Sequence, residues 1–187
     1  VYIILLNLLK QLMKKVLTIF FFLSLISEAQ EYEKAPNIIL IMVDDLGAEC
    51  LNSYGGTSYE TPILNKMSEN GMQFENAHSM PICTPSRVKL MTGKTNKKNH
   101  VEFAYLDPKE KTFSQELQSA GYETLIAGKW QLGQNKKLPK HFGFDEHILW
   151  QLNTRGRDST GLDKRYSNPR LVKNGITYEE NEGRFST

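Results

Sequence analysis

The stretch Asn37-Ile38-Ile39-Leu40-Ile41-Met42-Val43 is followed directly by Asp44-Asp45-Leu46-Gly47. Its first seven residues form an apolar run of strand length, which is typical of a central strand covered on both faces by helices. Two acidic residues and a glycine then end the run abruptly. The stretch therefore predicts a central strand of an α/β sheet, with two carboxylates at its carboxyl end.

The chain after this stretch alternates between helical and strand-like patterns. Helices are predicted where a capping residue or a proline precedes apolar residues at helical spacing, and strands where apolar runs or alternation are short. The predicted helices begin at Thr61, Thr84 and Thr112, and the predicted strands span 72–77 and 122–127. This alternation predicts an α/β fold, with a mostly parallel central sheet and helices on both faces.

The composition excludes several classes of protein. The chain has 187 residues, of which 40% are hydrophobic and 24% charged, as in an ordinary globular domain or a piece of a larger one. The first 29 residues hold three of the 23 basic and one of the 21 acidic side chains, which leaves 20 of each beyond them. Because the remainder is formally neutral and has no basic stripe with interleaved aromatics, we expect no nucleic-acid partner.

The N-terminal region has the pattern of a secretory signal peptide. Met13-Lys14-Lys15 precedes the apolar run Val16–Ile26, and Ser27-Glu28-Ala29 supplies small residues for cleavage after Ala29. A bilayer-spanning helix needs about 20 apolar residues, so a permanent anchor is the less favoured alternative. We expect 13–29 to be the signal, 1–12 to be an upstream extension absent from the mature protein, and the export machinery to deliver 30–187 to the periplasm or the medium.

The motif Cys83-Thr84-Pro85-Ser86-Arg87 has two interpretations. In the first it is a capped helix start, with Thr84 as the N-cap, Pro85 at the first helical position and Arg87 in solvent. In the second, helix N–H groups and the helix dipole favour an anion beside Cys83, and Arg87 adds a fixed cation one turn along. The other cysteine is Cys50, so export allows one disulfide or two buried thiols.

The motif resembles that of the sulfatase family, in which Cys-x-Pro-x-Arg directs oxidation of the cysteine to formylglycine during export. The resemblance runs colinearly from about Ala35 to Trp150 and implies an alkaline phosphatase-like fold. It also implies a sulfuric ester hydrolase of which 30–187 is the N-terminal part of the catalytic domain, truncated at Thr187. The segments that carry it are Asn37–Gly47, Thr61–Gly71, Phe74 with Asn76–Ser79, Leu90–Lys94 and Gly121–Trp130.

The resemblance also assigns site residues. It makes Asp44 and Asp45 metal ligands, together with the formylglycine formed from Cys83, and it makes Arg87 and Lys129 catalytic, with Lys129 contacting the sulfate group. Hard oxygen donors at the carboxyl end of a strand suit Ca²⁺, with Mg²⁺ as the alternative. Without the resemblance, two acidic residues after a strand are ordinary loop or cap residues, and Lys129 is an ordinary loop lysine.

The reaction implied by the resemblance uses a hydrated aldehyde, in which one hydroxyl attacks sulfur and the second later expels sulfate. The family usually has histidine two positions after the lysine. Gln131 stands there in this chain, and an amide hydrogen-bonds but does not serve as a proton donor as imidazolium does. The remaining candidates have structural or surface roles in this interpretation, namely His78, His100, His141, His147 and Cys50.

Substrates and partners follow from the same resemblance. We expect an aryl sulfate or a sulfated glycan as the substrate, and a formylglycine-generating enzyme as a maturation partner. The family's further metal ligands, histidine and lysine have no counterpart before Thr187, so the chain alone is expected to be inactive. Two alternatives stay open: a phosphonate or phosphate ester hydrolase of the same superfamily, and a non-catalytic exported binding module with an unmodified Cys83, which Gln131 would favour.

Overall fold

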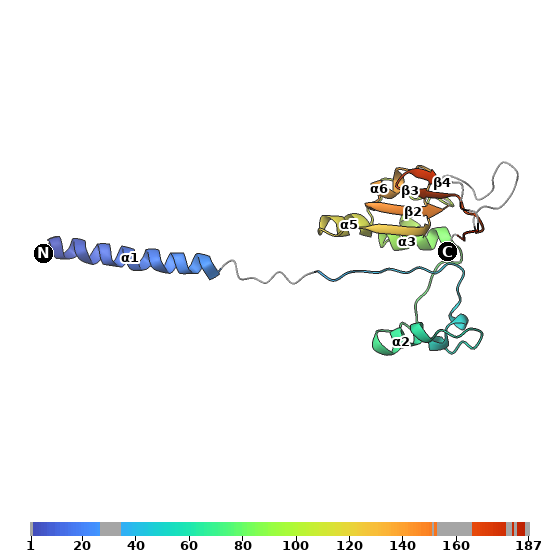
Figure 1. Ribbon diagram of the computed structural model, residues 1–187, viewed down its shortest axis with the longest axis horizontal. Helices are drawn as coiled ribbons and strands as arrows, with labels where there is room; N and C mark the ends of the chain where they lie inside the picture. The colour runs from blue at the N-terminus through green and yellow to red at the C-terminus, as the bar shows by residue number, and fades with distance from the viewer. Residues whose placement is uncertain are drawn as a thin grey trace. The chain divides into compact units, whose positions relative to one another are not determined.

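The computed structural model describes residues 2–26, 35–150, 152, 166–178, 181 and 183–185. The chain divides into two compact units, Val1–Val43 and Asp44–Thr187. The first unit contains helix α1 (Tyr2–Ile26), and the second contains a sheet with its helices (Figure 1).

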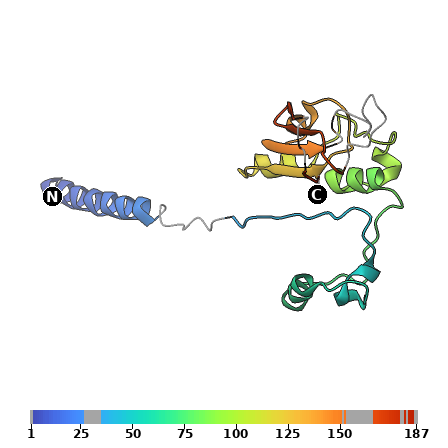
Figure 2. The ribbon, with the colours of Figure 1, turned by 45° about the vertical axis from the view of Figure 1, so that its right-hand side comes forward.

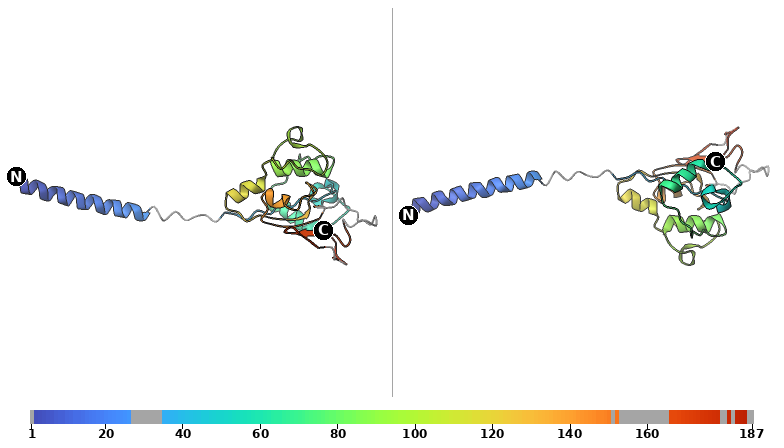
Figure 3. Two further views of the ribbon diagram at one scale, coloured as in Figure 1. Left: turned by 90° about the horizontal axis from the view of Figure 1, so that it is seen from above. Right: turned by 90° about the horizontal axis from the view of Figure 1, so that it is seen from below.

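Helix α1 runs without interruption through the predicted upstream extension and the apolar run of the predicted signal peptide (Figure 3). In the part of the chain that the structure describes, no helix combines the length and apolar character that crossing a bilayer requires. The boundary between residues 12 and 13 stays a prediction. Cleavage after Ala29 also stays a prediction, since this position lies outside the described residues.

Residues 37–43 do not form the predicted central strand. Residues 35–43 have no regular secondary structure, and Ile39 is 85% exposed and Ile41 74% exposed. A strand that is apolar on both faces forms only where neighbouring strands satisfy its N–H and C=O groups and helices cover it. The apolar run itself supplies neither the neighbouring strands nor the covering helices. The predicted strand 72–77 is absent for the same reason, with Phe74 exposed and its carbonyl oxygen accepting a hydrogen bond from the Tyr54 hydroxyl.

The sheet of the second unit has four strands in the order β1-β2-β3-β4. β1 and β2 are parallel, whereas β3 and β4 continue the sheet in antiparallel fashion, so the described sheet is mixed. The predicted strand 122–127 corresponds to β1, displaced by two to three residues. The strands are β1 (Leu125–Lys129), β2 (Glu146–Trp150), β3 (Leu171–Lys173) and β4 (Ile176–Tyr178).

Three predicted helices are confirmed. Helix α2 begins with Pro62 at its first position, and α5 begins with a capping box, in which Thr112 and Gln115 exchange side-chain and backbone hydrogen bonds. Two short helices, α4 and α6, and two 3₁₀ turns complete the set. The helices are η1 (Ala48–Cys50), η2 (Asn52–Tyr54), α2 (Pro62–Asn70), α3 (Cys83–Thr92), α4 (Asn96–Asn99), α5 (Phe113–Ser119) and α6 (Leu138–His141).

The start of α3 differs from the capped-helix interpretation. Ile82 occupies the N-cap position and forms no side-chain cap, and Cys83 is already the first helical residue. Thr84 is therefore not the N-cap, and Pro85 lies at the third helical position. The Thr84 side chain is fully buried and bonds to groups far along the chain, which explains why it does not cap its own helix.

The hydrophobic core packs α3, α5 and α6 beside the sheet (Figures 1 and 2). Val88 and Met91 of α3 belong to the same buried cluster as Trp130, which follows β1. The Trp130 ring meets the edge of Phe144 at 6.4 Å between centroids. This packing holds the motif at the start of α3 next to the carboxyl end of β1.

Candidate functional site

Three predicted site residues meet around one carboxylate. Oδ2 of Asp44 lies 2.9 Å from Nη2 of Arg87 and 2.7 Å from Nζ of Lys129. Nη1 of Arg87 also donates to the main-chain carbonyl of Lys129 at 2.7 Å. The three side chains are 27%, 13% and 14% exposed, in that order, so solvent screens them only in part. The fold thus brings α3, the end of β1 and the start of the second unit together.

The two cations keep Asp44 ionised. Partial burial alone would raise the pKa of this carboxyl group, but hydrogen bonds and charge attraction from Lys129 and Arg87 outweigh burial and lower the pKa below its usual range. The pair of cations and the carboxylate carry one net positive charge. The cluster can therefore accept an additional anion without an uncompensated buried charge.

Cys83 lies in direct contact with Gln131. Its Sγ donates to Oε1 of Gln131 at 2.7 Å, and the Thr84 hydroxyl donates to the same oxygen at 3.3 Å. The Thr84 oxygen in turn accepts from the backbone N–H of Ala104 at 3.1 Å. Gln131 is buried, so two donors and its surroundings fix the orientation of its amide. The network anchors the side chain at position 83 one helical turn from Arg87.

Left-handed backbone conformations gather around this network. Asp45, Ala104 and Gln131 have φ angles of 55°, 60° and 52°, although none of them is glycine. Such conformations cost about 1 kcal/mol or more each and persist where the surrounding structure holds them in place. Ala104 contacts Thr84, Gln131 contacts Cys83, and Asp45 adjoins Asp44. Three of the five non-glycine residues with such φ angles in the described part of the chain thus lie in segments that position the candidate site, and the other two are Asn168 and Asn174.

Two contributors to the site were not predicted from the sequence. Thr84 links Gln131 to Ala104, and Trp150, the last residue of β2, lies against Lys129 with its ring centroid 5.9 Å from Nζ. Thr84 lies within the motif Cys83–Arg87, and the capped-helix interpretation of this motif gives its hydroxyl the role of an N-cap. Trp150 carried no sequence signal, because its position depends on the pairing of β1 with β2.

The other nucleophilic and imidazole side chains lie elsewhere. Cys50 and Cys83 are both free thiols, so the disulfide alternative is not realised. His78 is exposed, His100 is half-buried, and His141 bonds through Nε2 to the carbonyl of Pro108 at 2.7 Å. His147 is buried in β2. These positions agree with structural or surface roles.

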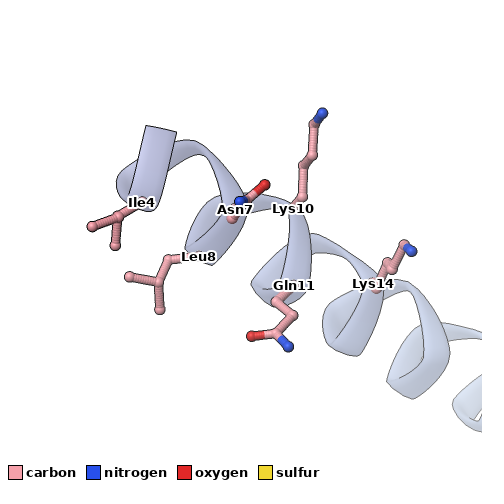
Figure 4. Close-up of a pocket in the computed structure, with 6 residues that line it drawn as sticks. All are labelled: Ile4, Asn7, Leu8, Lys10, Gln11 and Lys14. Carbon is pink, nitrogen blue, oxygen red and sulfur yellow. The ribbon is translucent and has the colours of Figure 1, made fainter. Parts of the chain in front are cut away.

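A hollow on the surface of α1 does not form a second site. All of its lining side chains come from this single helix, and the two lysines point to the opposite side from the apolar residues (Figure 4). A ligand-binding site needs walls that enclose the ligand, and the surface of a single helix does not provide them. The lining residues are Ile4, Asn7, Leu8, Lys10, Gln11 and Lys14.

Two solved structures that share this fold were solved with a sugar bound. The chain superimposes on Ps i-CgsB, solved in complex with k-i-k-neocarrahexaose, with a TM-score of 0.68 and 26% identity, covering 80% of this chain and 38% of that one. A second structure, solved with its substrate D-glucosamine-2-N,6-O-disulfate, matches with a TM-score of 0.63 and 26% identity over 81% of this chain and 28% of that one.

Curated relatives and a family model agree with these structures. Human N-acetylgalactosamine-6-sulfatase is 38% identical over 59% of this chain, and an arylsulfatase of Hemicentrotus pulcherrimus is 33% identical over 77% of it. The model of the family described as Sulfatase matches residues 36–184. The chain belongs to the sulfatase family. It spans 24% of the length of the human relative and 30% of the sea-urchin one.

Sulfatases use a formylglycine and a divalent metal, and the described residues meet these two requirements to different degrees. Position 83 fits a formylglycine hydrate, because Oε1 of Gln131 would accept a hydroxyl as it accepts the thiol. Asp44 and Asp45 are hard oxygen donors, but within the described ranges no three His, Cys, Asp or Glu side chains gather. A metal therefore has only part of its shell here.

Proposed function

We propose that the full-length protein hydrolyses sulfate esters through a formylglycine formed from Cys83. The observation that carries the proposal is the convergence of Arg87 and Lys129 on Asp44, one helical turn from Cys83. Membership of the sulfatase family supports the same reaction. The proposal concerns the whole protein, since this chain spans about a quarter of its curated relatives.

Arg87 and Lys129 bind and orient the sulfate group in this proposal. A sulfate monoester carries one negative charge spread over its non-bridging oxygens, and a guanidinium and an ammonium group both donate to such oxygens. Asp44 holds the two cations in place before the substrate arrives, so little reorganisation is needed on binding. Charge that develops on the sulfuryl oxygens during the reaction is then met by groups already in position.

Gln131 and Thr84 orient the group at position 83. A formylglycine there would supply two hydroxyls as its hydrate. One would attack sulfur and give up its proton while the S–O bond to the ester alcohol breaks and the alcohol leaves protonated; the other would then lose its proton to re-form the aldehyde C=O as the C–O bond to sulfate breaks. The Gln131 amide oxygen holds one hydroxyl by accepting its hydrogen, and Thr84 fixes that amide from the other side. Because an amide does not titrate near neutral pH, Gln131 orients this hydroxyl without taking up its proton.

Asp44 and Asp45 are the residues that we assign to the divalent metal. Their carboxylates suit Ca²⁺, with Mg²⁺ as the alternative. The formylglycine formed from Cys83 would be a third ligand, and the remaining ligands would come from outside the described residues. When bound, such an ion supplies positive charge beside the sulfuryl oxygens.

We further propose a sulfated glycan or an aryl sulfate as the substrate, and export as the route to it. A solved neighbour holds a disulfated glucosamine, and a human relative is named for a sulfated galactosamine, which supports the glycan class. The signal pattern at 13–29 supports delivery to the periplasm or the medium, after maturation by a formylglycine-generating enzyme.

The test uses the full-length protein, co-expressed with a formylglycine-generating enzyme. Initial rates are measured on an aryl sulfate, the matched aryl phosphate and sulfated disaccharides, with Cys83→Ala as the inactive control and Cys50→Ala as the matched control. Sulfate ester hydrolysis that requires Cys83 and not Cys50 is expected. A higher kcat/KM on the phosphate would favour the phosphate hydrolase, and no hydrolysis with an intact Cys83 thiol would favour a binding module.

A further inference from the structure

Lys129 and Trp150 occupy equivalent ends of two neighbouring strands. Lys129 is the last residue of β1, Trp150 is the last residue of β2, and the parallel register pairs them directly. Register partners on adjacent strands project their side chains from the same face of a sheet. The backbone continues the pairing, because Trp130 N–H donates to the carbonyl of Trp150 at 3.0 Å. The sheet itself therefore fixes the indole beside the ammonium group.

The ammonium group of Lys129 is held between two different partners. One is Oδ2 of Asp44 at 2.7 Å, and the other is the Trp150 ring, whose centroid lies 5.9 Å from Nζ. This separation lies within the range of cation–π attraction. Trp150 is 4% exposed and the Lys129 side chain 14%, so water screens the attraction little. The Tyr166 ring packs against the Trp150 ring at 5.6 Å between centroids.

The indole carries a cost that a phenyl ring would avoid. Nε1 of Trp150 is buried and has no hydrogen-bond partner among the described residues. A buried unpaired donor is unfavourable, whereas phenylalanine would fill much of the same space without one. The specific advantage of indole at this position is its stronger attraction for a cation. Trp130 also has a buried Nε1 without a partner among the described residues, so this cost is not peculiar to position 150. What indole adds at position 150 beyond core packing is the contact with Lys129.

We propose that Trp150 is a positioning residue that holds the Lys129 ammonium, within its ion pair with Asp44, in the position that faces the sulfate group. The sulfate part of this inference rests on the proposed function. Two partners confine Nζ more than the Asp44 carboxylate alone would. Without the ring, Lys129 keeps its ion pair but spends less time in the position that faces an incoming anion.

The first experiment measures anion binding in the full-length protein. Trp150→Leu removes the ring, Trp150→Phe keeps a weaker one, and Leu149→Val perturbs the same buried strand on its opposite face. We expect Trp150→Leu to raise the KM for an aryl sulfate and the inhibition constant of inorganic sulfate about fivefold, with Trp150→Phe in between. Leu149→Val should lower Tm and leave both constants unchanged. Equal changes from Leu149→Val and Trp150→Leu would overturn the proposal.

The second experiment is a double-mutant cycle on unfolding, with Trp150→Leu and Lys129→Met. Trp150→Leu should reduce the folding equilibrium constant about fivefold more when Lys129 is present than in the Lys129→Met background. Additive effects would show that the ring does not hold the ammonium. This cycle needs no activity, so it separates the two proposals: absence of sulfate ester hydrolysis contradicts the proposed function, whereas additivity contradicts the role of Trp150.

Discussion

At the scale of single residues, the site is an arrangement of charges around Asp44. Its carboxylate neutralises one of the two cations that meet it, and the remaining positive charge is available to an anion. Gln131 brings a neutral amide to Cys83, so orientation at position 83 is separated from proton transfer. Each of these functions depends on one or two side chains, so single substitutions test them.

Conversion of Cys83 depends on the local motif. We expect mass spectrometry of the exported chain to show the Cys83 peptide about 18 Da lighter, because CH₂–SH becomes CHO. Arg87→Ala or Pro85→Ala should reduce conversion and leave secretion intact, and the Cys50 peptide serves as the internal control. An intact thiol at Cys83 from a competent host would contradict the prediction.

The Asp44 cluster should make stability depend on acid pH. The folded-state pKa of Asp44 is lowered, so its contribution is fully present above the unfolded pKa of about 4 and is lost as pH falls through the folded value. Asp44→Asn should lower the free energy of unfolding by about 1 kcal/mol near neutral pH. In urea titrations, the free energy of unfolding of this variant should decrease less as the pH falls. Asp45→Asn is the matched control, since Asp45 is exposed. An equal decrease of the free energy of unfolding with falling pH in both variants would argue against a stabilising role of the Asp44 cluster.

At the scale of elements, helix starts and strand ends determine where the site residues lie. The Thr112 hydroxyl caps α5 by accepting from Gln115 N–H and also donates to the carbonyl of Phe142 at 2.6 Å. The hairpin of β3 and β4 is tied to β2, because Gly175 N–H donates to Nε2 of His147 at 3.1 Å. The first connection is buried and the second partly buried, and both join segments that lie far apart in the sequence.

Removal of the α5 cap should destabilise the second unit. Thr112→Ala eliminates the cap and one buried hydrogen bond, so a loss of about 2 kcal/mol in the free energy of unfolding is expected from denaturant titration. Thr95→Ala changes the N-cap of α4, where the side chain forms no cap hydrogen bond, and should cost much less. Equal losses would contradict the role of the capping box.

His147 should make the hairpin sensitive to mild acid. Burial lowers the pKa of His147, and its Nε2 accepts a hydrogen bond only when neutral. The hairpin is therefore most stable above the unfolded pKa of about 6.5 and loses stability as pH falls toward the folded value. Hydrogen exchange at the Gly175 amide, corrected for intrinsic rates, should show less protection at pH 5 than at pH 7.5. His141→Asn should leave this dependence intact, and His147→Asn should remove it.

At the scale of the whole molecule, the chain consists of a helical N-terminal unit and a sulfatase-family unit. The N-terminal unit contains the signal-peptide pattern, and the family match begins at residue 36. Export before folding would expose the Cys83 motif to a maturing enzyme while the chain is still extended. In the proposed function, location and chemistry would be connected through the order in which the chain is processed.

Processing should remove the N-terminal unit's helix. We expect N-terminal sequencing of the exported protein to begin at Gln30, because Ser27-Glu28-Ala29 places small residues at the cleavage positions. Ala29→Arg should block cleavage and leave a larger precursor, whereas Gln30→Ala should be processed normally. Retention of Met13 or Lys14 in the exported protein would contradict the prediction.

The sequence alone determined the features that depend on neighbouring residues. The capping box of α5, the proline start of α2 and the motif at 83–87 all act within a few residues, and helix hydrogen bonds close within one turn. Family resemblance, a property of residue order, predicted Asp44, Arg87 and Lys129 as site residues, and the structure brings their side chains together.

Only the tertiary structure decided the features that need partners far along the chain. Residues 37–43 have a strand-like sequence but no strand structure, since backbone pairing and coverage come from other segments. Thr84 binds Gln131 and Ala104 instead of capping α3, because burial brings distant polar groups within reach. Trp150 meets Lys129 through the register of β1 and β2, and strand register is set by packing and pairing across the sheet.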